Sequence, residues 1–251
     1  MHDTSFENLK LFSKTYLSNK TSLKVIDVGS RLRTPEKIVE WKKILGDVDY
    51  IGVDLVSGEN VDIILKNPYQ YPFEDESIDV IIANSIFEHS EFFWKLFLEL
   101  VRILKPNGLL YINAPSNGDF HRGPFNQDVL VDVYRFYPDS GKALQKWGNY
   151  SGFKDLILLE SYIFNRRSKN WNDFVAVFLK NKNYAKDFQD RIIENTSHFY
   201  NGYSFGKKSI LNYQELTEDH VLLFQKQYFK RIKIKLSNIY KNIKIFLRRI
   251  K

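Results

Sequence analysis

The chain has 251 residues, of which 43% are hydrophobic and 16% aromatic, so it can bury the core of one large domain. It contains no cysteine, which excludes disulfides and cysteine-ligated zinc or iron–sulfur sites. No apolar run reaches the roughly 18 residues of a membrane span, and the N-terminal segment lacks the apolar core of a signal peptide. A cytoplasmic protein is therefore expected.

The net charge of +7 is concentrated at the C-terminus. Residues 226–251 contain ten Lys or Arg and no Asp or Glu, which leaves 27 basic and 30 acidic side chains in residues 1–225. The body of the protein is therefore slightly acidic, and the charge distribution argues against nucleic acid as its partner.

Apolar spacing predicts helices and strands that alternate along the chain. The first helix is indicated by Phe6, Leu9, Phe12 and Tyr16, which fall at helical spacing. Helices are expected at residues 5–17, 35–45, 92–104 and 138–150, and strands at residues 24–30, 50–55, 61–65, 78–86, 109–114, 156–164 and 174–179. This order predicts an α/β fold with a mostly parallel seven-stranded sheet and helices on both faces. The last two strands have no helix between them, which predicts a hairpin at one edge.

The same pattern divides the chain into three parts. Residues 1–182 are expected to form the α/β domain with its N-terminal helix, and residues 183–225 a helical or irregular extension packed on the core. Residues 226–251 are expected to form a basic amphipathic helix.

The loops that follow the parallel strands are the expected ligand site, because open parallel sheets bind ligands at the carboxyl ends of their strands. Asp54 ends the second strand, roughly 20 to 30 residues after the first turn, where a carboxylate commonly binds the two ribose hydroxyls of an adenosine. The alternative role of Asp54 is a helix cap or a solvated turn. The spaced glycines of a nicotinamide-binding loop are absent.

Several segments, in order, resemble class I methyltransferases that use S-adenosylmethionine. They are residues 24–30 (KVIDVGS), 72–80 (PFEDESIDV), 88–89 (EH) and 99–108 (ELVRILKPNG). The resemblance implies a Rossmann-like fold, S-adenosylmethionine as cofactor and S-adenosylhomocysteine as product. It places cofactor contacts at Asp27, Gly29, Ser30, Arg31, Asp54, Leu55, Asn67, Pro68, Tyr69, Asn84, Ser85 and His89. The first loop departs from the family in having one glycine where two or three are common.

Residues 121–124 (HRGP) and 134–139 (YRFYPD) are similar to a type 11-like branch of the family that is often associated with surface glycans. This similarity implies O-methylation of a sugar or glycan precursor. Two alternatives remain: a phosphoryl-type group or another small metabolite as acceptor, and a binding module without turnover, which the glycine-poor loop favours.

A hydroxyl acceptor requires a base, and histidine suits this task near neutral pH. His121 and His89 are the candidates; His89 has the alternative role of a helix-start residue packed beside the cofactor. Candidate substrate-binding residues are Arg122, Asp132, Tyr134 and Arg135. For the two arginines the alternative is surface ion pairing, and no metal-ligand cluster is evident.

The C-terminal segment carries an apolar stripe on an otherwise basic helix. Its members are Ile232, Leu236, Ile239, Ile243, Phe246 and Ile250. The stripe and the charge favour an anionic membrane surface as partner, which would place the protein peripherally at the inner membrane. A short coiled coil and packing on the domain are the alternatives, and the oligomeric state is open.

Overall fold

A computed structural model of the chain describes residues 3–18, 20–31, 35–120, 131–164 and 172–215, together with helical residues between 228 and 237. The chain divides into two compact units, Met1–Tyr213 and Gln214–Lys251, each of which is described by itself.

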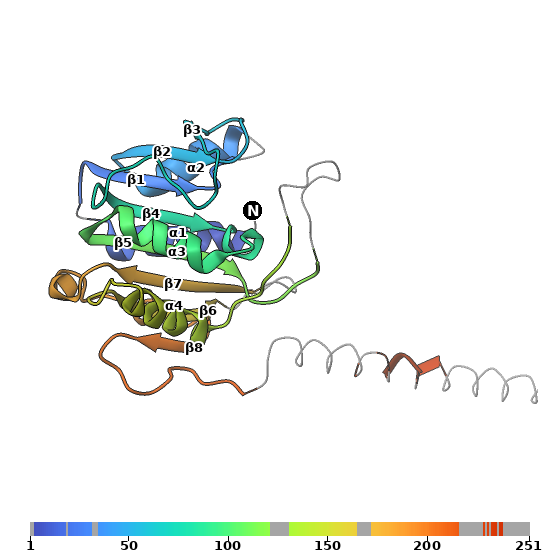
Figure 1. Cartoon of the computed structure of the whole chain (residues 1–251). Helices are drawn as coiled ribbons and strands as arrows, with labels where there is room; N and C mark the ends of the chain where they lie inside the picture. Colours follow the sequence, from blue (N-terminus) through green and yellow to red (C-terminus); the bar gives the residue numbers. More distant parts are fainter. Residues whose placement is uncertain are drawn as a thin grey trace, which may run out of the picture. The chain divides into compact units, whose positions relative to one another are not determined.

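The first unit is built on a sheet of eight strands in the order β3-β2-β1-β4-β5-β7-β6-β8 (Figure 1). The strands are β1 (Leu23–Val28), β2 (Val48–Asp54), β3 (Ile63–Ile64), β4 (Ile78–Asn84), β5 (Leu104–Pro115), β6 (Ile157–Phe164), β7 (Asp173–Leu179) and β8 (Phe199–Ser204). The first five strands are mutually parallel, and β7, β6 and β8 follow in antiparallel pairing. The predicted α/β fold and the antiparallel pairing of β6 with β7 are confirmed, but the predicted position of this pair at the edge of the sheet is wrong, because β8 pairs with β6 and forms the edge.

The sheet has one strand more than the sequence predicted. The extra strand, β8, lies in the segment expected to be helical or irregular, which also contains two short 3-10 helices, η2 (Lys182–Asp187) and η3 (Ile192–Glu194). Its sequence contains Asn201 with φ +53° and Gly202, residues that disfavour strands. The strand forms because its residues pair with the open edge of β6, a tertiary contact that local sequence does not reveal.

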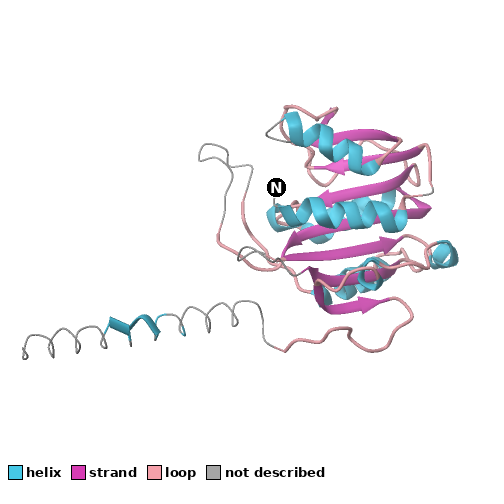
Figure 2. Ribbon diagram, turned by 180° about the vertical axis from the view of Figure 1, so that it is seen from behind, coloured by secondary structure: helices cyan, strands magenta, loops and turns pink. Residues whose placement is uncertain are grey.

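α-Helices cover both faces of the sheet (Figure 2). They are α1 (Asp3–Tyr16), α2 (Pro35–Leu45), α3 (Phe93–Ile103) and α4 (Pro138–Tyr150), and a short 3-10 helix, η1 (Phe87–His89), follows β4. One apolar cluster contains the buried side chains of α3 and α4, and the other contains those of α1 and α2. Successive apolar residues of β4 alternate between the two clusters, so this central strand is buried on both faces.

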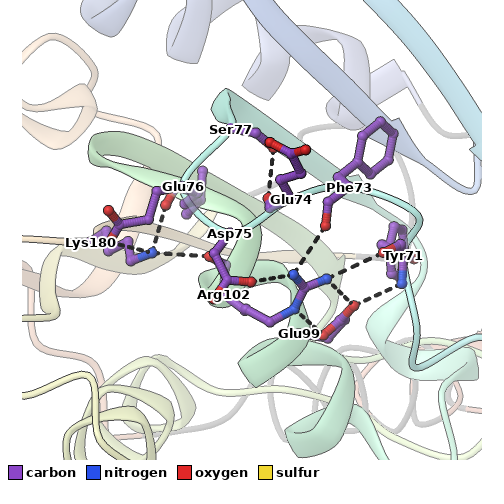
Figure 3. A network of polar contacts seen from close by, with 10 residues as sticks. Tyr71, Phe73, Glu74, Asp75, Glu76, Ser77, Glu99, Arg102 and Lys180 are labelled. Carbon is purple, nitrogen blue, oxygen red and sulfur yellow. Dashed lines mark hydrogen bonds and ion pairs between the residues drawn. The ribbon is translucent and has the colours of Figure 1, made fainter.

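A polar network fastens α3 to the loop before β4 (Figure 3). The Arg102 guanidinium donates hydrogen bonds to both carboxylate oxygens of Glu99 (2.8 and 2.7 Å) and to Asp75 (2.5 Å). It also donates to the carbonyls of Tyr71 (3.2 Å) and Phe73 (3.0 Å). These residues lie at the amino end of β4, opposite the edge where the sheet is expected to bind ligand. Two of the segments that resemble the methyltransferases therefore contribute to the fold rather than to chemistry.

Lys180, the residue that follows β7, extends this network. The Lys180 ammonium donates to the carbonyls of Arg102 (3.0 Å) and Leu104 (2.7 Å) and lies 3.3 Å from the Glu76 carboxylate. The carbonyls at the C-terminal end of α3 are thereby paired, as helix ends require.

We expect Arg102→Ala to lower the free energy of unfolding by about 2 kcal/mol, because it leaves Glu99 and two carbonyls without their donor. The expected change in the free energy of unfolding is no larger because the Arg102 side chain is 30% exposed and its charge is partly screened. Urea unfolding followed by circular dichroism measures the change. The exposed Lys95 on the same helix is the control, and equal stability of Arg102→Ala and Lys95→Ala would contradict the prediction.

In the second unit, the described residues of 228–237 are helical, and they include Ile232 and Leu236, the first two members of the apolar stripe. The other members lie outside the described residues. Among the described helices of the chain, none has the length and apolar character needed to cross a membrane.

Candidate functional site

The first turn of the candidate site follows β1 and depends on one glycine. Gly29 has φ +72°, a backbone conformation that favours glycine, and its amide donates to the Val53 carbonyl (2.8 Å). A Cβ at this position would lie 1.8 Å from Cδ1 of Ile86, which follows β4. The loops after β1 and β4 are therefore in contact, and a larger residue cannot replace Gly29 without moving one of them.

The second residue of the turn is held by the loop after β2. The Ser30 hydroxyl donates to the Asn60 carbonyl (2.7 Å), and the Asn60 amide donates to the Ser30 carbonyl (3.0 Å). Ser30 is 1% exposed. Side-chain bonds to residues 55–62 thus hold the turn in place, which explains how it forms with fewer glycines than the family commonly has.

Asp27 lies just before this turn in the sequence, and its side chain is buried. Its carboxylate accepts a hydrogen bond from the Tyr50 hydroxyl (2.6 Å), and Tyr50 accepts one from Asn60 (2.6 Å). Burial raises the pKa of Asp27 to about 7. The structure thus places Asp27 in a buried chain of hydrogen bonds that leads through Tyr50 and Asn60 to Ser30.

Asp54 joins the loops after β1 and β2. Its two carboxylate oxygens accept hydrogen bonds from the amides of Arg31 and Val56, each at 3.1 Å. Asp54 is partly buried, and a carboxylate has about four acceptor positions, so two remain for the hydroxyls of a ligand. Leu55 and Arg31, the residues beside it, are exposed.

The loop after β3 forms the next part of this edge. The Asn67 side chain accepts a hydrogen bond from the Tyr69 amide (2.9 Å), a local turn with the exposed Pro68 between them. The Tyr69 hydroxyl accepts from the Phe92 amide (3.2 Å), and the two rings lie 5.7 Å apart. These two contacts fix the position of Tyr69 at the edge of the sheet where a ligand is expected to bind.

The end of β4 brings two more predicted residues to the site. Ser85 has φ +56°, an uncommon conformation for a residue with a side chain, and its amide donates to the Asn113 carbonyl (2.7 Å). Asn84, the last residue of the strand, is 5% exposed. Backbone strain at this position is typical of functional sites.

The structure assigns a tautomer to His89. Its Nδ1 lies 2.5 Å from the Val131 carbonyl, which can only accept, so Nδ1 carries the proton and Nε2 is the basic nitrogen of the neutral ring. Nε2 lies 3.6 Å from Oε1 of Glu88. The imidazole is therefore oriented, with its basic nitrogen beside a carboxyl group.

Glu88 belongs to a segment that resembles the methyltransferases but was not among the predicted site residues. It is 1% exposed, and burial raises its pKa to about 8. Its backbone carbonyl accepts hydrogen bonds from Val133 (2.8 Å) and Tyr134 (3.2 Å), which holds the chain after β5 against η1. A carboxyl group with a raised pKa in a strand-end loop is a candidate proton carrier.

Two predicted substrate-binding residues bind each other. The Arg135 guanidinium donates to both carboxylate oxygens of Asp132 (2.5 and 2.8 Å) and to the carbonyls of Tyr134 and Asp119. The Tyr134 hydroxyl donates to the Glu91 carbonyl (3.1 Å). These contacts stabilise the conformation of residues 132–135, and they favour the ion-pairing alternative for Arg135. The other two candidates, His121 and Arg122, lie outside the described residues.

The described residues contain no group of three side chains suited to hold a metal ion.

Comparisons with known proteins give one family match and several similar folds. Residues 44–112 match the family model described as "Methyltransferase domain". No curated protein sequence gives a significant match. The 1,6-didemethyltoxoflavin-N1-methyltransferase of Burkholderia thailandensis, solved with 1,6-didemethyltoxoflavin and S-adenosylhomocysteine, is similar in structure, with a TM-score of 0.52 and 13% identity over 71% of this chain and 79% of that chain. The YcgJ protein of Bacillus subtilis has a TM-score of 0.49 and 15% identity over 72% of this chain and 99% of that chain.

At this level of identity the structural likeness concerns the fold. The likeness shows that this chain has the fold of class I methyltransferases. Residues 44–112, a little over a quarter of the chain, match the methyltransferase family model.

Proposed function

We propose that the protein is an S-adenosylmethionine-dependent methyltransferase. The main support for this proposal is that the Gly29 turn lies next to the Asp54 carboxylate. The turn has a backbone conformation that favours glycine. It lies beside a carboxylate with two further acceptor positions, at the carboxyl ends of parallel strands.

The residues at this edge would hold the parts of the cofactor in order. Gly29, Ser30 and Arg31 would bind the methionine part through their backbone, and Asp54 and Leu55 the ribose. Asn67, Pro68 and Tyr69 would enclose the adenine. Asn84, Ser85 and His89 would line the side on which the methyl group is presented. When bound, the cofactor supplies a methyl group on a positively charged sulfur.

The chain's own residues would position the acceptor and remove its proton. An acceptor hydroxyl that takes a methyl group must lose its proton, and in the neutral tautomer of His89 the lone pair that can accept a proton is on Nε2. Glu88 lies beside that nitrogen and would stabilise the protonated ring when ionised. His121 remains a second candidate for the base.

We further propose that the acceptor is a hydroxyl of a sugar or glycan precursor in the cytoplasm, on the basis of the segments 121–124 and 134–139. Arg122, Asp132, Tyr134 and Arg135 remain the candidate substrate contacts from those segments. A phosphoryl-type group or another small metabolite is the alternative acceptor.

Calorimetric titration of the purified chain with S-adenosylhomocysteine tests the core of the proposal. Micromolar binding is expected, because the turn and the carboxylate are already in place without ligand. A wild-type protein that does not bind this product would leave a methyltransferase fold with a binding role and no turnover.

For residues 226–251 we propose a basic amphipathic helix that binds an anionic membrane surface. Each Lys or Arg near such a surface contributes about 1 kcal/mol, and the segment has ten of them. We expect the full chain to sediment with vesicles that contain anionic lipid and to be released by high salt, whereas the chain without residues 226–251 stays in solution. Equal sedimentation of the two proteins would rule out this role.

A further inference from the structure

Five neutral polar side chains are buried together where β4 and β5 end. They are Thr4, Ser5 and Asn8 on α1, Asn84 at the end of β4, and Asn113 near the end of β5. Each is at most 5% exposed. Buried polar groups in such number require an explanation in terms of their partners.

The strand register and one hydrogen bond place three of these residues next to one another. Asn84 and Asn113 are partners in the parallel pairing of β4 and β5, so their side chains lie on the same face of the sheet. The Asn8 amide donates to Oδ1 of Asn113 (2.9 Å). The face is therefore the one that α1 covers.

The direction of α1 places the other two at the edge of the sheet. Phe12 packs on Tyr111 with ring centroids 4.7 Å apart, so α1 runs antiparallel to β5, and the residues before Asn8 lie toward its carboxyl end. Thr4 and Ser5 precede Asn8 by four and three residues and so lie on the same side of the helix. Figure 1 shows the N-terminus at this edge.

Six polar atoms of this cluster have no hydrogen-bond partner within the part of the chain that the structure describes. They are both side-chain atoms of Asn84, Nδ2 of Asn113, Oδ1 of Asn8 and the hydroxyl oxygens of Thr4 and Ser5. Each buried polar group without a partner costs about 1–3 kcal/mol. Polar groups without partners do not stabilise the folded chain, but they are suited to bind a polar molecule.

The cluster adjoins the loop that would hold the reactive end of the cofactor. In the parallel pairing of β1 with β4, Val28 lies opposite Ala83, so the next residues, Gly29 and Asn84, come level with each other. Ser85, with its strained backbone, donates to the carbonyl of Asn113. A molecule held by the cluster would therefore lie beside the first turn, where methyl transfer requires its acceptor.

We propose that Thr4, Ser5, Asn8, Asn84 and Asn113 bind the hydroxyl groups of a neutral acceptor. None of the five side chains is charged, and together they offer both donors and acceptors, the combination that matches hydroxyls, which donate and accept at once. A phosphate or carboxylate would find no cation among them. This inference rests on the proposed methyltransferase function, and it makes α1 part of the acceptor site.

The test measures transfer of labelled methyl from S-adenosylmethionine to neutral methyl glycosides and, in parallel, to sugar phosphates. We expect the neutral glycosides to be labelled by the full chain. The combined Thr4→Val and Ser5→Ala variant should raise KM for the glycoside about tenfold, with kcat changed by less than about twofold. Its affinity for S-adenosylhomocysteine should not change. Its stability should be equal or higher, because it removes two hydroxyls that make no hydrogen bond with the described residues.

Ser13→Ala is the matched control, because Ser13 lies on the same helix and its hydroxyl donates to the Ile44 carbonyl (2.7 Å). This variant should lower stability and leave KM unchanged. Labelling of sugar phosphates alone, no labelling of any glycoside, or an unchanged KM in the double variant would overturn the proposal while binding of S-adenosylhomocysteine persists. Loss of that binding in the wild type would instead remove the methyltransferase function on which the proposal rests.

Discussion

Replacing Asp54 by alanine should reduce the affinity for S-adenosylhomocysteine about 100-fold or more, equivalent to about 2.7 kcal/mol. The carboxylate would accept hydrogen bonds from both ribose hydroxyls, and bonds to a charged acceptor are about twice as strong as neutral ones. The variant also removes the acceptor of the Arg31 and Val56 amides, which hold the two loops together. Calorimetric titration of the wild type and the variant gives the ratio directly.

Two further variants separate the loss of a ligand contact from the loss of loop structure. Asp54→Asn keeps an oxygen for one backbone amide but lacks the charge, so its affinity should fall between those of the wild type and Asp54→Ala. Asp49→Ala changes an exposed residue near the other end of the same strand and should bind like the wild type. Affinity within about threefold of the wild type in Asp54→Ala would mean that Asp54 only shapes the turn.

The position of Asp54 could be predicted because it depends on local sequence and on one general rule. The run from Tyr50 to Asp54 is apolar and β-branched in pattern, and parallel strands bind ligands where they end. The same rule pointed to the loop that contains Gly29, whereas Asn84 and Ser85 were expected from the resemblance to methyltransferases. Helix α2 has the predicted bounds of residues 35–45, because Pro35 favours the first position of a helix and Gly46 ends it.

The contacts that decide what each side chain does could not be predicted in the same way. Asp132 and Arg135 were candidates for substrate binding, yet their three-residue spacing lets them bind each other. Burial raises the pKa of Glu88, and the segment after β5 is hydrogen-bonded to its backbone. Burial of this kind arises from chain segments that are distant in the sequence.

The helix α1 shows the same limit most clearly. Phe12 and Tyr16 predicted a helix, since their spacing matches an apolar stripe. Thr4, Ser5 and Asn8 lie on the buried side too, where a sequence pattern would assign polar residues to solvent. An acceptor site built from them is therefore invisible to periodicity, and its detection required the register of β4 against β5.

Asp27→Asn should remove a large part of the pH dependence of stability. Burial raises the pKa of Asp27 from its usual 3.8 to about 7, so the unfolded chain loses this proton at a lower pH than the folded chain. The stability that the neutral carboxyl contributes is complete below about pH 4 and is lost as the pH rises to about 7. The loss is on the order of 4 kcal/mol, at about 1.4 kcal/mol for each pKa unit.

Asparagine keeps an oxygen that can accept the hydrogen bond from Tyr50 but does not ionise, so the variant should lack this loss. Urea unfolding measures the free energy of unfolding of both proteins at about pH 4 and about pH 8. The value for the variant minus that for the wild type should be several kcal/mol larger at about pH 8 than at about pH 4. Burial also raises the pKa of Glu88 and Glu160, so both proteins should still lose some stability as the pH rises. The difference between them isolates Asp27. A constant difference at both pH values would mean that Asp27 ionises as readily in the folded protein as in the unfolded chain, and that the hydrogen-bond chain to Ser30 begins with a charged rather than a neutral carboxyl.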